Sequence, residues 1–78
     1  MLRITYRNVT GRELDLMVSS KQKIKETLRV LNDTQIYHMS SKIPDYVIAR
    51  RRNRRVPTEC TYEQAEIYEG DILEIPET

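Results

Sequence analysis

The sequence predicts an α+β domain in which one α-helix packs on a sheet of short strands. Residues 2–7 and 12–18 alternate apolar and polar side chains, which is the period of a strand with one buried face. From Lys21 to about Asn32 the apolar residues follow the period of an amphipathic helix. Short apolar segments return at residues 46–50 and 72–75. A chain of 78 residues has room for one hydrophobic core, so we expect a single domain.

The two N-terminal strands are expected to form a β-hairpin. Their connection ends in Gly11, which tolerates the positive φ that tight turns require. Because both strands keep their apolar residues in phase across this turn, pairing is favoured. The expected inward side chains are Leu2, Ile4, Tyr6, Leu14, Leu16 and Val18.

The predicted helix turns an apolar stripe towards this hairpin. Ser19 and Ser20 precede it and offer an N-cap, because a serine oxygen accepts a hydrogen bond from a free N–H group of the first turn. The face opposite the stripe is mainly charged, which places it in solvent. The stripe consists of Ile24, Thr27, Leu28 and Leu31.

A polar connector and a third strand follow the helix. The connector spans residues 34–45 and has three expected core anchors, Ile36, Met39 and Ile43. The third strand, residues 46–50, leads through the turn Arg51-Arg52-Asn53-Arg54 into a short arm, Arg55-Val56. Asn53 suits a left-handed conformation in that turn. Pro57 predicts an edge strand, because proline has no N–H to donate to a neighbouring strand.

A capped turn introduces the last strand. Thr61 is expected to cap one helical turn, Tyr62–Ala65, and Ile67 then enters the core. The chain turns again at Gly70 and Asp71. The inward residues of the final strand are Leu73 and Ile75.

Over residues 1–75, this order of elements resembles the ubiquitin β-grasp. The resemblance includes the Thr10-Gly11 turn, the inward Ile4, Val18 before the expected serine cap, the turn from Thr61 to Ile67, and the ending GDILEI. It is strongest for the small bacterial ubiquitin-like proteins of the YukD kind, which accompany type VII (ESX-like) secretion systems. The resemblance implies a mixed sheet of four to five strands on one α-helix. It further implies one domain over residues 1–78 with an ordered core at about 2–75, and a non-conjugated accessory or regulatory module of that secretion system.

Two features of the sequence differ from ubiquitin. Ubiquitin and the sulfur-carrier proteins end in Gly-Gly, whereas Pro76, Glu77 and Thr78 follow the final strand here, so we expect neither conjugation nor sulfur transfer. The segment Arg50–Arg55 is longer and more basic than the corresponding turn of ubiquitin.

The residue types present argue against an enzyme. His38 is the only histidine and Cys60 the only cysteine, and two such residues cannot furnish a four-ligand zinc site. Cys60 is expected to behave as a small, partly buried apolar residue. The acidic residues of the second half lack the spacing of a calcium loop, and there is no glycine-rich phosphate loop. We therefore expect no catalytic residue, no metal site and no cofactor.

Cysteine usage and hydropathy suggest a cytoplasmic protein. One cysteine excludes an internal disulfide and fits a reducing compartment. No apolar segment approaches the ~18 residues that cross a bilayer, so we expect no direct membrane insertion.

Charge is distributed unevenly along the chain. Residues 1–55 hold all 13 Lys and Arg with five acidic residues, a balance of +8, whereas residues 56–78 hold seven acidic residues, a balance of −7. If the final strand lies between strands of the basic part, Arg3, Arg7 or Arg50 stands opposite Glu74 or Asp71. We expect such cross-strand pairs to cancel much of the asymmetry.

The basic turn is the first candidate site. Guanidinium groups bind carboxylates and phosphates in bidentate geometry. Three interpretations stay open: a solvated hairpin tip that prevents edge-to-edge aggregation, a docking element for an acidic protein surface, and a nucleic-acid-binding site as the alternative function. The turn comprises Arg50, Arg51, Arg52, Arg54 and Arg55.

The outer face of the sheet is the second candidate site. By their position in the β-grasp, Ile48 and Ile72 fall on that face, although the phase of the YVIA strand fits either register. Arg3, Thr5 and Glu74 would form a polar rim around them; the opposing interpretation is that of scattered surface residues. The resemblance to the YukD kind implies that the partner is a protein, namely a cytoplasmic region of a membrane secretion component. The oligomeric state stays open.

Overall fold

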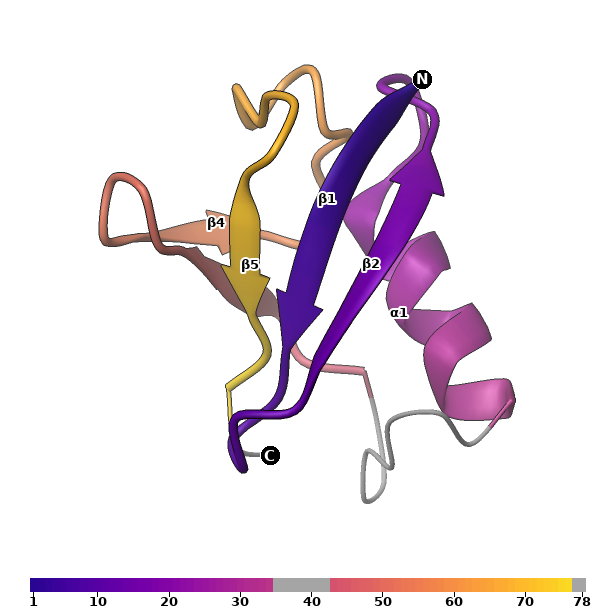
Figure 1. The fold of residues 1–78 in the computed structure, drawn as a ribbon. Helices are drawn as coiled ribbons and strands as arrows, with labels where there is room; N and C mark the ends of the chain where they lie inside the picture. The colour runs from indigo at the N-terminus through magenta and orange to yellow at the C-terminus, as the bar shows by residue number, and fades with distance from the viewer. Residues whose placement is uncertain (35–42, 77–78) are drawn as a thin grey trace.

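The computed structural model describes residues 1–34 and 43–76. Within these residues it has one helix and five strands. Figure 1 shows how they are arranged. In chain order these are β1 (Leu2–Arg7), β2 (Glu13–Val18), α1 (Ile24–Asp33), β3 (Tyr46–Ala49), β4 (Arg54–Pro57) and β5 (Ile72–Glu74).

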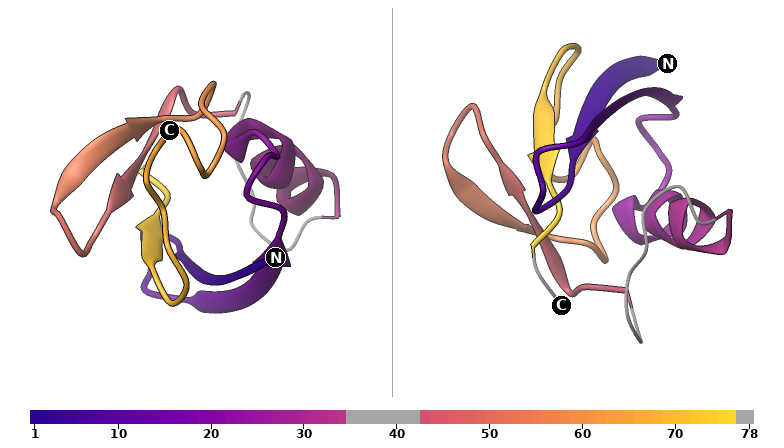
Figure 2. Two further views of the ribbon diagram at one scale, coloured as in Figure 1. Left: turned by 90° about the horizontal axis from the view of Figure 1, so that it is seen from above. Right: turned by 60° about the horizontal axis from the view of Figure 1, so that its bottom comes forward.

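The strands form a single mixed sheet in the order β2-β1-β5-β3-β4. β1 and β5 are parallel, and the other neighbouring pairs are antiparallel. The final strand therefore lies between the two hairpins, which is the arrangement that the resemblance to the β-grasp implies. Figure 2 shows the sheet curving partly around α1, so that one face covers the core and the other faces outward. This is the architecture of a ubiquitin-like β-grasp, which confirms the predicted α+β fold class.

The core contains the side chains that alternation and helical periodicity place inward. The stripe of α1 is buried throughout, and Leu73 and Ile75 bring the end of the chain into the same cluster. Leu2, Leu14 and Leu16 are only partly buried, because they lie on the hairpin at one end of the sheet. Ile43 packs against the cluster as predicted, whereas Ile36 and Met39 lie outside the described residues.

The predicted start of α1 is wrong. The helix begins at Ile24 rather than Lys21, its N-cap residue is Lys23, and no side chain caps it. The Ile24 N–H donates to the Cys60 carbonyl at 3.0 Å, and the Lys25 N–H donates to the Thr58 carbonyl at 2.9 Å. Since a distant backbone segment satisfies these donors, the serine cap is not needed.

The predicted cap at Thr61 is confirmed. Thr61 Oγ1 accepts the Gln64 N–H, and Gln64 Oε1 accepts the Thr61 N–H, each at 3.0 Å. This reciprocal pair is a capping box. It starts a single turn in which the Ala65 N–H donates to the Thr61 carbonyl at 3.0 Å. The turn ends at Glu66, which has a positive φ of 58°.

Two local predictions in the β3–β4 hairpin also hold. Asn53 adopts the left-handed conformation with φ of 52°. Pro57 lies on β4, which is an edge strand of the sheet.

A row of hydroxyl groups crosses the core. The Tyr6 and Tyr62 hydroxyls lie 2.7 Å apart, and the Tyr62 hydroxyl donates to Thr27 Oγ1 at 2.7 Å. Both rings are fully buried. Burial raises the pKa of Tyr6 well above its ordinary value, and it raises that of Tyr62 as well. The row links β1, α1 and the Thr61 turn.

Candidate interaction surface

The outer face of the sheet is formed by the residues that alternate with the core residues. Ile48 and Ile72 both lie on this face and are partly buried, whereas Val47 and Leu73 are fully buried on the inner face. The open question of phase in YVIA is thereby answered in favour of an outward Ile48. A one-residue shift would expose Val47 and bury Ile48, so the register also fixes which residues a partner can reach.

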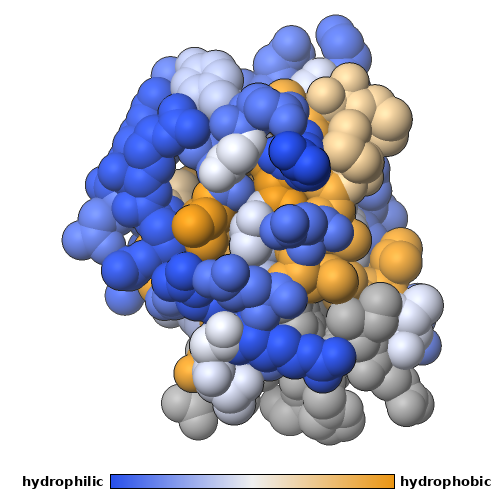
Figure 3. Space-filling view, viewed as in Figure 1, coloured by the Kyte–Doolittle hydropathy of each residue, from blue (hydrophilic) through white to orange (hydrophobic). Residues whose placement is uncertain are grey.

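The two isoleucines are diagonal neighbours rather than direct cross-strand partners. Ile48 stands opposite Glu74 in the β3–β5 pairing, and Ile72 stands opposite Thr5 in the β1–β5 pairing. Diagonal side chains on one face are within reach of each other in a sheet. Ile48 and Ile72 therefore lie on one small area of the outer face. In Figure 3, hydrophilic side chains dominate the surface over β5 and the β3–β4 turn, with apolar atoms visible between them.

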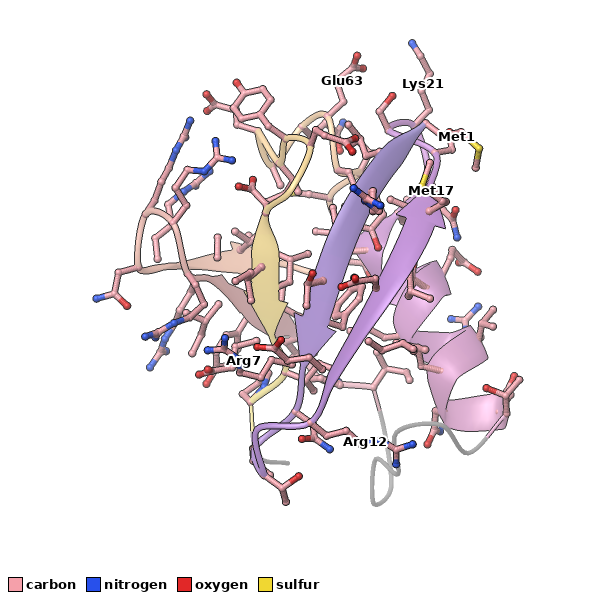
Figure 4. The ribbon with its side chains drawn as sticks, in the orientation of Figure 1. Met1, Arg7, Arg12, Met17, Lys21 and Glu63 are labelled. Carbon is pink, nitrogen blue, oxygen red and sulfur yellow. The ribbon has the colours of Figure 1, made fainter. Side chains whose placement is uncertain are left out.

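Glu74, one predicted rim residue, belongs to a charged row across three strands. Arg7 lies between Glu13 on β2 and Glu74 on β5. Its Nε donates to Glu13 Oε2 at 2.8 Å, and its guanidinium lies 3.9 Å from Glu74 Oε2. Figure 4 shows Arg7 at the lower ends of β1 and β5. The expected cross-strand pairing of an N-terminal arginine with Glu74 is therefore present.

Arg3, another predicted rim residue, lies farther from the centre. It stands opposite Met17 on β2, two residues before Thr5. Its backbone N–H donates to Glu69 Oε1 at 2.9 Å. Figure 4 shows Met17 beside Met1 near this end of β2, and both side chains are exposed.

Three arginines of the basic turn contact the acidic part of the same chain. Arg51 lies 2.7 Å from Asp71 Oδ1, and Arg52 lies 3.6 Å from Glu66 Oε2. Arg54 donates to the Ala65 carbonyl at 2.7 Å. The turn is thus held against residues 65–71, and these contacts cancel part of the charge asymmetry of the sequence.

Asp71 is the buried member of these contacts. Its side chain is 5 % exposed, and Oδ2 accepts the Tyr68 N–H at 2.8 Å. The Arg51 guanidinium approaches Oδ1 closely but without the alignment of a hydrogen bond, so we treat this contact as an ion pair. The carboxylate therefore fixes both the loop before β5 and the basic turn.

Two tyrosine rings lie beside the arginines. The guanidinium carbons of Arg51 and Arg52 lie 6.0 and 5.8 Å from the centre of the Tyr68 ring. That of Arg55 lies 4.7 Å from the centre of the Tyr46 ring. These are cation–π distances. The role of Tyr68 was missed by sequence analysis, because no local pattern brings residue 68 next to residue 51.

A shallow hollow of about 260 Å³ opens between the basic turn and β5. Ile72 lies at its wall together with Gly70 and Asp71, and the arginine side of the hollow is formed by Arg50 and Arg51. The hollow joins the two areas that sequence analysis treats as separate sites. It is open to solvent, and its lining combines one aliphatic residue with two arginines and one aspartate.

The remaining candidate chemistry is limited. Over residues 1–34 and 43–76, no group of three or more His, Cys, Asp or Glu side chains is arranged to hold a metal ion. Cys60 is half-buried and packs against the core, as expected, and His38 lies outside the described residues. At the start of α1, Glu59 lies 2.8 Å from Lys25 and 3.8 Å from Lys23. The hydrogen bond from Lys25 lowers the pKa of Glu59.

Comparison with known proteins supports the fold. No protein-family model matches the chain, and no curated protein sequence matches it. Among solved structures, the chain is similar to a de novo designed protein based on ubiquitin, with 26 % sequence identity and a TM-score of 0.72. The similarity covers 96 % of this chain and 85 % of that protein. The chain therefore has a ubiquitin-like fold. In the described part of the chain, no helix is long and apolar enough to span a membrane.

Proposed function

We propose that this domain is a protein-interaction module that binds its partner non-covalently through the outer face of the sheet. The observation that supports the proposal is the position of Ile48 and Ile72, which are diagonal neighbours on a face that is otherwise mainly polar. Interfaces of this kind have an apolar centre and a polar rim. β5 is paired on both sides, so the centre of the surface is rigid before binding.

The resemblance to YukD-like proteins suggests the cellular process in which the domain acts. We propose an accessory or regulatory role in a bacterial type VII secretion system, with the domain in the cytoplasm and a cytoplasmic region of a membrane component as its partner. Ubiquitin-like domains of this size are typically interaction modules rather than enzymes. The single domain over residues 1–78 is part of the same proposal.

Co-purification tests this proposal. A tagged chain is expressed in a bacterium that carries such a secretion system, and detergent-solubilised membranes are analysed for a retained secretion component. The unmodified chain is expected to retain the component, and the double variant Ile48→Asp/Ile72→Asp is expected to lose it. Val30→Asp is the matched control, because Val30 is an exposed aliphatic residue on α1, away from the outer face.

A milder variant separates loss of contact from loss of fold. Ile48→Thr/Ile72→Thr keeps the β-branched shape that suits strands while it removes apolar surface. Retention of the same component by a folded Ile48→Asp/Ile72→Asp variant would rule out the outer face as the binding surface. Retention of no secretion component by the unmodified chain would rule out the secretion role.

A further inference from the structure

Three arginines differ from the other basic residues that the structure describes. Within residues 1–34 and 43–76, the side chains of Arg3, Arg50 and Arg55 contact neither a carboxylate nor a backbone carbonyl. Every other Lys and Arg side chain in these residues, setting Arg12 aside, makes such a contact. Arg50 has only a long hydrogen bond of 3.5 Å to the Asn53 side chain, and Arg55 lies over the Tyr46 ring.

These three arginines lie on the same face as the two isoleucines, with Arg50 and Arg55 beside them and Arg3 farther along β1. Arg55 is the direct cross-strand partner of Ile48 on the edge strand β4. Arg50 follows β3, its N–H donates to the Ile72 carbonyl at 3.0 Å, and it lines the hollow together with Ile72. Arg3 lies on β1, two residues before the partner of Ile72. All three are exposed.

The acidic side chains of this face are already engaged. Glu13 and Glu74 both face Arg7, and Asp15 accepts the Thr5 hydroxyl hydrogen bond at 2.6 Å. They therefore leave the three guanidinium groups without a carboxylate partner. A guanidinium binds a carboxylate in a bidentate manner, and the attraction strengthens when docking excludes water. Charge complementarity consequently favours an anionic partner here.

The apolar centre favours a protein over a nucleic acid. Binding of single-stranded nucleic acid relies on free aromatic rings on which bases stack. The two tyrosine rings near the basic turn, Tyr46 and Tyr68, are instead approached by arginines of the same chain. The centre of the positive area consists of aliphatic side chains, which suit an aliphatic anchor of a partner.

We propose that the outer face binds an acidic protein segment in which one or two aliphatic side chains are flanked by Asp or Glu. The aliphatic side chains pack on Ile48 and Ile72, and the carboxylates pair with Arg50, Arg55 and Arg3. This inference rests on the proposed function, because it names the chemistry of the partner at the same surface.

Selection from a library of random displayed peptides tests this inference without knowledge of the natural partner. Peptides that bind the immobilised full chain are sequenced, and the most enriched one is synthesised. We expect enrichment of Asp and Glu next to Leu, Ile or Val, and an affinity that decreases as salt increases. We expect the double variant Arg50→Glu/Arg55→Glu to weaken binding about tenfold or more.

A matched control variant makes the same change in net charge at two residues outside the sheet. Lys21→Glu/Arg29→Glu alters two exposed residues outside the sheet, and its binding is expected to stay within about twofold of the unmodified chain. Arg50→Gln/Arg55→Gln removes the charge without reversing it, which keeps the test valid if the Glu variant folds poorly. Circular dichroism verifies the fold of each variant.

The possible results separate the two proposals. Enriched peptides that are neutral or basic, or that bind the folded Arg50→Glu/Arg55→Glu variant unchanged, would overturn the acidic partner. If the binding of such peptides is lost in the Ile48→Asp/Ile72→Asp variant, the proposed interaction surface itself stands. Binding that needs neither the arginines nor the isoleucines, or no enrichment by the folded chain, contradicts both proposals. A different result would be that a single-stranded oligonucleotide displaces the peptide and loses its binding in the Arg50→Glu/Arg55→Glu variant. That result would overturn the acidic protein segment and identify a nucleic acid as the partner.

Discussion

The hydroxyl group of Tyr62 connects two other buried hydroxyls. It lies 2.7 Å from both the Tyr6 hydroxyl and Thr27 Oγ1. Tyr62→Phe removes this connection and leaves buried polar groups with fewer partners, so we expect a loss of about 1–3 kcal/mol in the free energy of unfolding. Urea unfolding measures this difference. Tyr68→Phe is the control, because Tyr68 is 48 % exposed, and we expect a change within about 0.5 kcal/mol.

The same tyrosines predict loss of stability at alkaline pH. Burial raises the pKa of Tyr6 and of Tyr62 in the folded state. A raised folded-state pKa means that the stabilisation is complete below the unfolded-state pKa of about 10 and is lost as pH rises towards the folded-state value. Urea unfolding from pH 8 to about pH 11 is expected to show this loss, with a smaller slope for Tyr62→Phe. Equal slopes in both proteins would contradict the role of the buried hydroxyls.

Single residues also show what the sequence leaves open. Alternation predicts that Ile4 and Leu73 face inward, because one buried face imposes a period of two. It leaves Ile48 undecided, because four apolar residues in succession carry no alternation. The contacts of Arg51 with Asp71 and Tyr68 depend on how the β3–β4 hairpin folds over the loop before β5. No local pattern predicts that arrangement.

Among the elements, α1 and the Thr61 turn begin in different ways. Thr61 caps its turn with a side chain, whereas the first N–H groups of α1 bind carbonyls of residues 58 and 60. Thr61→Ala is expected to lower the free energy of unfolding by about 1 kcal/mol, which thermal or urea unfolding can measure. Ser20→Ala is expected to change it by less than about 0.5 kcal/mol. A larger loss in the free energy of unfolding for Ser20→Ala than for Thr61→Ala would contradict this account and support the serine cap that the sequence predicts.

The periodicity of each element was predictable, but the start of α1 was not. Residues 19–23 contain good capping residues, and local rules therefore place the helix start near Lys21. The observed start at Ile24 depends on a segment more than thirty residues later in the chain. Helix boundaries that are fixed by tertiary hydrogen bonds of this kind are not visible in a local window.

At the scale of the whole molecule, one hydrophobic cluster joins all the major elements. A small domain with one core is expected to unfold in a single cooperative step. Far-ultraviolet circular dichroism and tyrosine fluorescence are expected to give coincident urea transitions. Two separated transitions would contradict the proposal of one domain over residues 1–78.

The order of the strands shows which part of the topology can be predicted from the sequence pattern. Two hairpins and one helix follow from alternation and turn residues. The insertion of β5 between β1 and β3 comes from the resemblance to the β-grasp, and the structure and its similarity to the ubiquitin-based design support it. This insertion brings Ile72 from the end of the chain next to Ile48. The candidate surface is therefore a property of the topology rather than of any one segment.

The central claim is that a partner binds the outer face at Ile48 and Ile72. Its most direct test is an amide NMR titration of the isotope-labelled chain with the selected acidic peptide. We predict that the largest shift changes lie in β1, β3 and β5, around Thr5, Ile48 and Ile72, and that they disappear in the Ile48→Asp/Ile72→Asp variant. Shift changes confined to α1 and the β2 edge, and retained in that variant, would contradict the claim.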